Sequence, residues 1–320
     1  MATTGSASLT AARVAIVSGK GGVGKTTVAA ALAVAAAKRG DRVLLAEMED
    51  REAFAPLFGL DTIGYEERLV APNLTALSVE TDEALVEYLQ MFYGIPRVSR
   101  ALIRSKAIEF ATHTAPGLQD ILHIGKIKEA ERRTRDGRFV YDLLILDAPP
   151  TGRLPRFLDA PRAIVDLVGS GPIRSQAQGV LDMVRDPART QVVLVVQPEQ
   201  MPVQETLMTI ETLGKMGIAM GPLVVNGLWS TIESLEGDTE AILRAEVEGR
   251  DLDLSDLAVE QLAMVAGAHA RRARNQRKAM RTLASGADMP HVELPYLFAP
   301  HIAQPQLNRL AAIMEGSGRL

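Results

Sequence analysis

The chain has 320 residues, a formal net charge of −4 and 47% hydrophobic residues, which is enough apolar material for a large folded core. It contains no cysteine, which excludes disulfides, zinc sites with cysteine ligands, iron–sulfur clusters and metalloid sites built from thiolates. The small negative charge provides no global field that would attract nucleic acid, so no nucleic-acid partner is expected.

The N-terminal residues 1–12 are expected to form a flexible tail in front of a single folded domain that takes up the rest of residues 1–320. Residues 1–10 are small and polar, and they lack the basic and apolar regions of a signal peptide. The longest apolar run, residues 28–37, is far shorter than a membrane span. We therefore expect a cytoplasmic protein.

A glycine-rich segment, Gly19 to Thr27, lies between an apolar run at 13–18 and an alanine-rich run at 28–38. It matches G-x-x-x-x-G-K-[ST], and its flanks predict the strand and helix that a phosphate-binding P-loop requires. Inward-pointing N–H groups and the positive end of the helix dipole would bind phosphate oxygens. Lys25 is expected to neutralise phosphate charge, and Thr26 to ligate Mg²⁺. The residues expected to bind ATP here are Gly21, Gly22, Val23, Gly24, Lys25, Thr26 and Thr27.

The second residue of this loop, Lys20, makes it a deviant P-loop. The loop resembles that of dimeric ATPases, which include the partitioning and division-site ATPases. In these proteins the lysine reaches the phosphates bound by the partner, so the resemblance implies a catalytic role for Lys20 in a dimer. A chain with one P-loop then needs a second protomer, either a copy of itself or a paralogue. An exposed loop lysine without this role is the alternative.

A second apolar strand at 42–47 ends in the acidic segment 47–50, at the sheet edge where α/β proteins bind ligands. Residues 51–72 are expected to form loop and short helix. The segments 82–135 and 160–188 are expected to be helical insertions, because the first is too long for an ordinary connection. Its large apolar residues could pack in a core or line a groove for a hydrophobic client or membrane protein; they are Phe92, Tyr93, Ile103 and Phe110.

The strongest second motif is the apolar strand 141–147, which ends in Asp147. An apolar strand that ends in aspartate is the Walker B pattern, and it predicts that Asp147 contacts Mg²⁺ directly or through water. Residues 147–161 read DAPPTGRLPRFLDAP. This segment resembles switch II of the arsenite-pump and tail-anchored-protein-targeting ATPases, with Arg153 in place of the usual histidine.

That resemblance implies an α/β fold, with a mostly parallel P-loop NTPase sheet, helices on both faces and an inserted helical subdomain. It implies that Glu49 occupies the position of the family's water-orienting aspartate, with Asp50 next to it as a second candidate. Gly152 would sense the γ-phosphate, Asn226 would hydrogen-bond adenine, and Pro295 would help to close over the base. Glutamate has a longer side chain than aspartate, which changes the geometry available for holding water.

The resemblance covers about residues 13–315 and is weakest in 231–288 and in the inserted helices. It implies an ATP-hydrolysing, nucleotide-switched dimer that handles a client or partner protein. A partitioning or positioning ATPase would use the basic stripe at 269–281 for DNA or the tail helix at 305–320 for membrane. A solvated helix face and ordinary core packing, respectively, explain these two segments better. A nucleotide-dependent scaffold that does not hydrolyse ATP is the third alternative.

Overall fold

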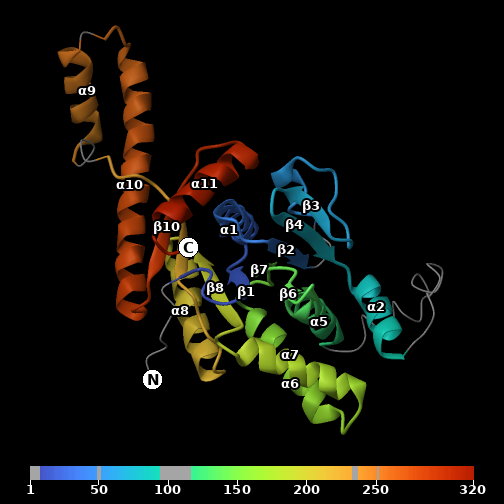
Figure 1. Ribbon diagram of the computed structural model, residues 1–320. Helices are drawn as coiled ribbons and strands as arrows, with labels where there is room; N and C mark the ends of the chain where they lie inside the picture. The colour runs from blue at the N-terminus through green and yellow to red at the C-terminus, as the bar shows by residue number, and fades with distance from the viewer. Residues whose placement is uncertain (1–7, 49–51, 94–116, 233–236, 251) are drawn as a thin grey trace.

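The computed structural model describes residues 8–48, 52–93, 117–232, 237–250 and 252–320. In this part of the chain an eight-stranded sheet lies between two layers of helices (Figure 1). The strand order is β10-β9-β8-β1-β7-β2-β4-β3, and only β3 is antiparallel to its neighbour. The strands are β1 (Val14–Gly19), β2 (Val43–Met48), β3 (Arg68–Ala71), β4 (Leu74–Val79), β7 (Leu143–Asp147), β8 (Thr190–Val196), β9 (Leu223–Leu228) and β10 (His291–Pro295). The predicted α/β class with a mostly parallel sheet is confirmed.

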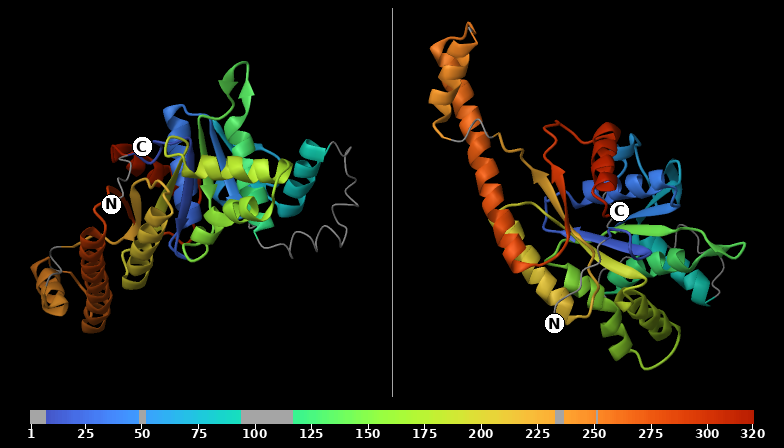
Figure 2. Two further views of the ribbon diagram at one scale, coloured as in Figure 1. Left: turned by 90° about the horizontal axis from the view of Figure 1, so that it is seen from below. Right: turned by 60° about the vertical axis from the view of Figure 1, so that its left-hand side comes forward.

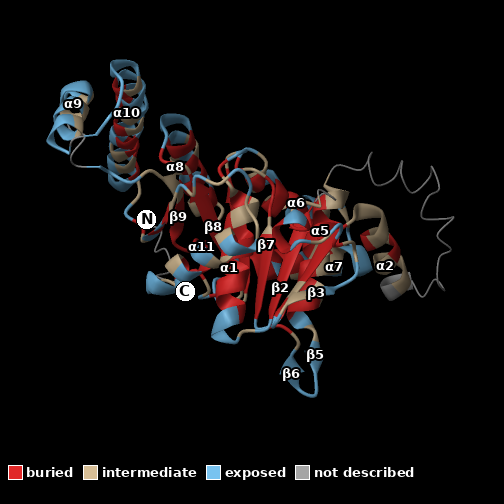
Figure 3. Cartoon of the chain, turned by 90° about the horizontal axis from the view of Figure 1, so that it is seen from above, coloured by how far each residue is buried: buried red, intermediate tan, exposed pale blue. Residues whose placement is uncertain are grey.

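Helices cover both faces of this sheet, and the buried residues concentrate in the strands and in the helix sides that face them (Figure 3). One face carries α1 (Lys25–Arg39), α11 (Gln304–Gly316) and the short 3-10 helix η1 (Pro56–Phe58). The other face carries α5 (Leu118–Arg132), α6 (Leu154–Leu167), α7 (Pro172–Arg185), α8 (Gln200–Lys215) and the C-terminal part of α10 (Asp256–Gly286). Both cores therefore share the sheet as their common wall.

The sequence of β1 explains why it lies in the middle of the sheet. All six of its residues are buried, as expected for a parallel strand that is covered on both faces. Val14 and Ile16 pack in one core, whereas Ala15 and Val17 pack in the other. The many alanines of α1 let this helix lie close to the sheet, and the helix ends at Gly40, whose φ of 105° suits glycine.

The expected flexible tail is wrong for residues 8–12. Leu9 is fully buried, and its N–H donates to the Arg319 carbonyl oxygen at 2.6 Å. The Gln191 side-chain amide donates to the Leu9 carbonyl oxygen, also at 2.6 Å. Residues 1–7 lie outside the described part of the chain. At the other end, α11 packs against α1 through a row of buried apolar side chains, which confirms core packing for the tail helix.

The first expected insertion is represented by α2 (Thr81–Tyr93) and α5, with residues 94–116 outside the described ranges. Its last residues form part of a small hairpin, β5 (Thr134–Arg135) with β6 (Arg138–Phe139), rather than a helix. The second insertion corresponds to α6 and α7. Among the described residues, no helix combines the length and apolar character that a membrane span requires.

A buried ion cluster around Glu131 fastens α5 to the edge of the sheet where β1 and β8 begin. The Glu131 carboxylate accepts hydrogen bonds from Arg13 at 3.3 Å and from Arg189 at 2.7 Å. Its side chain is only 5% exposed, whereas both guanidinium groups are partly exposed. Removing one member of such a cluster leaves the other charges desolvated and poorly paired.

We therefore predict that Glu131→Gln lowers the free energy of unfolding by about 3 kcal/mol, measured by urea denaturation. The matched control is Asp142→Asn, because Asp142 pairs with Arg42 at 2.7 Å and both side chains are more than 40% exposed. The control should cost about 0–1 kcal/mol. Equal losses in the two variants would contradict this role for the buried cluster.

Candidate nucleotide site

The P-loop leaves the sheet at Gly19, the last residue of β1, and α1 begins at Lys25. A Cβ atom at Gly19 would overlap the Val195 carbonyl oxygen of the neighbouring strand, so no larger residue fits there. Gly24 has a φ of 90°, and a Cβ atom on it would overlap the Asn226 side-chain amide. The loop is therefore held in one path by the strands on either side of it.

Within the loop, Gly21 and Gly22 are exposed, Val23 is buried, and Thr27 is half-buried. Lys25 is 8% exposed and lies in the first turn of α1, which contains no acidic residue. The positive end of the helix dipole and this buried lysine thus both lie at the N-terminus of α1. Together they favour the binding of an anion there.

Thr26, in the first turn of α1, contacts Asp147 at the end of β7. The Thr26 hydroxyl donates to the Asp147 carboxylate at 2.6 Å, although the two residues are 121 positions apart in the chain. A hydroxyl beside a carboxylate next to a phosphate-binding loop suits Mg²⁺, which prefers oxygen ligands and shares them with phosphates. The residues present therefore fit the metal that the sequence predicts. Elsewhere, the described residues contain no cluster of three acidic or histidine side chains that could bind a metal.

Lys20 is held by Glu205 of α8. Its ammonium lies 2.9 Å from one carboxylate oxygen of Glu205, and the other oxygen accepts a short hydrogen bond from the Thr151 hydroxyl. The bond to Lys20 and the bond to Thr151 hold the pKa of Glu205 below its usual value. Glu205 thus joins the P-loop, the segment after β7 and α8. Glu205 was not among the site residues that the sequence predicted.

Glu47 is a second residue whose contacts sequence reasoning missed. It is 1% exposed and lies beside Asp147 in the pairing of β2 with β7. Its carboxylate accepts hydrogen bonds from the N–H groups of Ala53 at 2.8 Å and Phe54 at 3.2 Å. Burial raises the pKa of Glu47, and the nearby Asp147 raises it further. A carboxylate inside an apolar strand was the available sequence signal.

The candidate water-orienting residues Glu49 and Asp50 lie outside the described residues. On either side of them, the hydrogen bond from the Ala53 N–H to the Glu47 carboxylate joins the end of β2 to the segment that follows. The candidate groove residues Phe92, Tyr93, Ile103 and Phe110 are likewise not among the described side chains.

The segment after β7 is tied to the P-loop on one side and to α5 on the other. The Ser18 hydroxyl donates to the Pro149 carbonyl oxygen at 2.6 Å, and the Thr151 N–H donates to the Gly19 carbonyl oxygen at 3.2 Å. Gly152 is exposed, with open space around its Cα. The Arg153 guanidinium, which replaces the histidine of the family's switch II pattern, donates to Asp120 of α5 at 2.8 Å.

The candidate base-binding residues come from β9 and β10. The Asn226 amide donates to the Val23 carbonyl oxygen at 2.8 Å, so it touches the P-loop itself. Pro295 ends β10, the edge strand, and aligns with Leu228 of β9 after a register shift. Gln276 of α10 is buried and bonds the backbone of Gly227 and Trp229, which fixes the chain where it leaves β9.

Comparison with known proteins agrees with these motifs. Residues 12–170 and 172–241 match the profile of the family described as anion-transporting ATPase. ATPase BagA of Mycobacterium tuberculosis is 38% identical over 306 residues, which cover 90% of this chain and 88% of that protein. The arsenical pump-driving ATPase of Acidiphilium multivorum is 30% identical over 236 residues, which cover 68% of this chain and 39% of that protein. A protein of the same description from Escherichia coli is 28% identical over 268 residues, 76% of this chain and 45% of that protein.

The resemblance to arsenite-pump ATPases that residues 147–161 indicated is thus confirmed over most of the sequence. This chain belongs to the anion-transporting ATPase family, and it is an ATPase.

Proposed function

We propose that this ATPase works in the cytoplasm as a nucleotide-switched dimer, which couples ATP binding and hydrolysis to the handling of a client or partner protein. The observation that carries the proposal is the contact of Glu205 with both Lys20 and Thr151. One carboxylate thereby joins the lysine that would reach a second protomer to the segment that would sense the γ-phosphate. The second protomer is a copy of this chain or a paralogue.

In the hydrolytic reaction, the chain binds and orients ATP and a water molecule. N–H groups of the P-loop and Lys25 would hold the phosphates, and Thr26 and Asp147 would hold Mg²⁺, which would neutralise phosphate charge. Glu49 or Asp50 orients the water for attack on the γ-phosphorus. The new oxygen–phosphorus bond forms as the bond to the β–γ bridging oxygen breaks, which yields ADP and phosphate.

Two contacts link this chemistry to the helical side of the molecule. Thr151 connects the segment after β7 to α8 through Glu205, and Arg153 connects it to Asp120 of α5. A change at the γ-phosphate end of that segment would therefore pull on α5, which packs beside α2. We infer that these inserted helices handle the client, and that the client is a hydrophobic or membrane protein.

Relatives of this chain are named as drivers of an arsenical pump. Because this chain has no cysteine, it cannot use thiolates to bind a metalloid itself. This difference supports a protein client over a metalloid one.

The first prediction concerns ATP binding. Lys25→Ala should weaken ATP binding at least about 100-fold, because the buried ammonium is the main side-chain charge facing the phosphates. The control is Lys38→Ala, an exposed lysine in the last turn of the same helix. Binding is measured by fluorescence of Trp229, the only tryptophan, or by calorimetry. Unchanged affinity in the Lys25 variant would refute the phosphate site.

The second prediction tests the switch. Lys20→Ala should leave ATP binding by the monomer intact but reduce ATP-dependent dimerisation and turnover, because the partner's phosphates lose a cation. Glu205→Gln should act in the opposite direction on dimerisation, by up to about fivefold, because a partly exposed ion pair restrains the lysine by about 1 kcal/mol. Light scattering with and without ATP measures both effects, at a protein concentration low enough that the chain without ATP is monomeric.

Glu211→Gln provides the matched control, because Glu211 pairs with Lys215 on the exposed side of the same helix, at 2.6 Å. It should change neither dimerisation nor turnover. If Lys20→Ala leaves turnover unchanged, the lysine does not act across a dimer, and the proposed switch is wrong.

The third prediction distinguishes hydrolysis from scaffolding. Glu49→Gln should lower kcat about 100-fold while ATP affinity stays within twofold, because a misplaced water slows the reaction without weakening phosphate binding. Asp50→Asn should have a much smaller effect. Phosphate release measures kcat. If both variants turn over ATP like the wild type, a residue of another chain or another segment orients the water.

A further inference from the structure

The C-terminal half of the molecule carries a helical hairpin that projects away from the sheet (Figures 1 and 2). We call residues 238–286 the arm; it consists of α9 (Thr239–Gly249), the connection 250–255 and α10. None of the α9 residues is buried. The last turns of α10 lie against the body beside α8, whereas its first turns touch only α9 in the part of the chain that the structure describes. In the outer part of the arm, only small side chains of α10 are buried against α9, among them Val259 and Ala263.

Large apolar side chains are exposed along the outer part of the arm. Leu257 is 62% exposed, Met264 68% and Val265 69%. Leu252 and Leu254, in the connection between the helices, are exposed as well and alternate with aspartates. Isolated exposed apolar residues are ordinary, but a run of them on one projecting element is typical of a surface that is covered by a partner.

The charges of the arm are divided between its two halves. Residues 238–260 contain eight acidic and two basic side chains, whereas residues 261–286 contain six basic side chains and no acidic one. Residues 238–260, which we call the tip, are therefore strongly negative. Residues 261–286, which we call the base, are equally positive. The helix dipole of α10 favours this polarity but accounts only for charges in its first and last turns.

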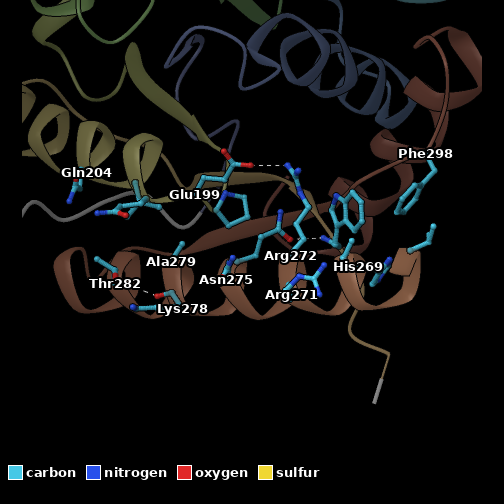
Figure 4. A pocket seen from close by; sticks show the side chains of 17 residues that line it. Glu199, Gln204, His269, Arg271, Arg272, Asn275, Lys278, Ala279, Thr282 and Phe298 are labelled. Carbon is cyan, nitrogen blue, oxygen red and sulfur yellow. Dashed lines mark hydrogen bonds and ion pairs between the residues drawn. The ribbon is translucent and has the colours of Figure 1, made fainter. Parts of the chain in front are cut away.

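The basic half borders a groove of about 1050 Å³ between α10, the start of α8 and a cluster of aromatic rings (Figure 4). Its walls include Trp229 and Phe298, whose ring centroids are 4.9 Å apart. Arg272 already pairs with Glu199 at 2.8 Å. Arg271 and Lys278 border the groove from the exposed side of α10, and among the described residues neither of them forms an ion pair.

The dimensions of this groove fit a polypeptide better than a small molecule. Its lining extends along α10 from Val265 to Thr282, which corresponds to about 25 Å of helix at 1.5 Å per residue. It combines an apolar and aromatic wall with the two exposed cations at its border. Its ligand should therefore be an extended or helical segment with leucines and carboxylates.

The tip of the arm is such a segment, and we propose that two copies of this chain pair through their arms. In an antiparallel, two-fold pair, the acidic, leucine-bearing tip of each arm lies in the basic groove of the other. Because tip and base are separated by the same length in both copies, both contacts can form at once. This interface is distinct from pairing across the P-loops and should form without nucleotide.

The experiment exchanges charges at the two ends of the arm. The base variant carries Arg271→Glu and Lys278→Glu; the tip variant carries Asp253→Lys and Glu260→Lys. Each alone places like charges opposite each other in both contacts and should weaken self-association at least about 100-fold. A mixture of the two variants has opposite charges in both contacts, so it should restore pairing with one chain of each kind. Sedimentation without nucleotide measures the association, and the circular dichroism of each variant confirms its fold.

High salt should weaken the wild-type pair, because the contacts are exposed ion pairs. A wild-type chain that is monomeric without nucleotide overturns the proposal, and so does a mixture that stays monomeric. ATP-dependent dimerisation that is lost in Lys20→Ala but kept in the base variant would leave the proposed switch standing. The two proposals can therefore fail separately.

Discussion

The site depends on a steric constraint in the middle of the sheet: the backbone at Gly19 touches the Val195 carbonyl oxygen so closely that no Cβ fits. This contact fixes the point at which β1 ends, between β7 and β8. The loop that follows must then turn over the carboxyl edge of the sheet, where Asp147 and Asn226 already stand. A shift of one residue in the end of β1 would move Thr26 away from Asp147. The chemistry of the edge is therefore a consequence of strand packing.

The order of the strands at this carboxyl edge of the sheet explains why one carboxylate can contact two separate segments. Glu205 lies on α8, which follows β8, and β8 is the direct neighbour of β1. The start of α8 is thereby brought beside the P-loop, and Glu205 reaches both Lys20 and Thr151. The ion pair is partly exposed, so it is weak enough to be exchanged for phosphate oxygens of a second protomer. A fully buried pair would hold the lysine too firmly for a switch.

Sequence alone predicted the parts of the site that depend on short patterns of neighbouring residues. The P-loop and the strand that ends in Asp147 each need only a few neighbouring residues to be recognised, and the fold follows from their order. The contact of Lys20 with Glu205 joins residues 185 positions apart, and no periodicity encodes it. Leu9 was assigned to the tail because its neighbours are polar, yet it packs in the core and pairs with the C-terminal segment. The edge strand β3 was missed because its side chains are largely exposed and show no alternation.

The arm and the P-loop place different demands on a second chain. Pairing across the P-loops is expected to depend on nucleotide, whereas pairing of the arms depends on charges that are always present. If the same two chains use both surfaces, pairing of the arms keeps the two P-loops at a high effective concentration. ATP binding then needs only to bring the two P-loops together, because the two chains are already associated. If a chain pairs with one partner through its arm and with a different partner across its P-loop, the assembly is extended instead of a closed two-fold pair. A chain with one P-loop and a charge-divided arm is suited to the first arrangement, because a pre-assembled pair removes the dependence of ATP turnover on protein concentration.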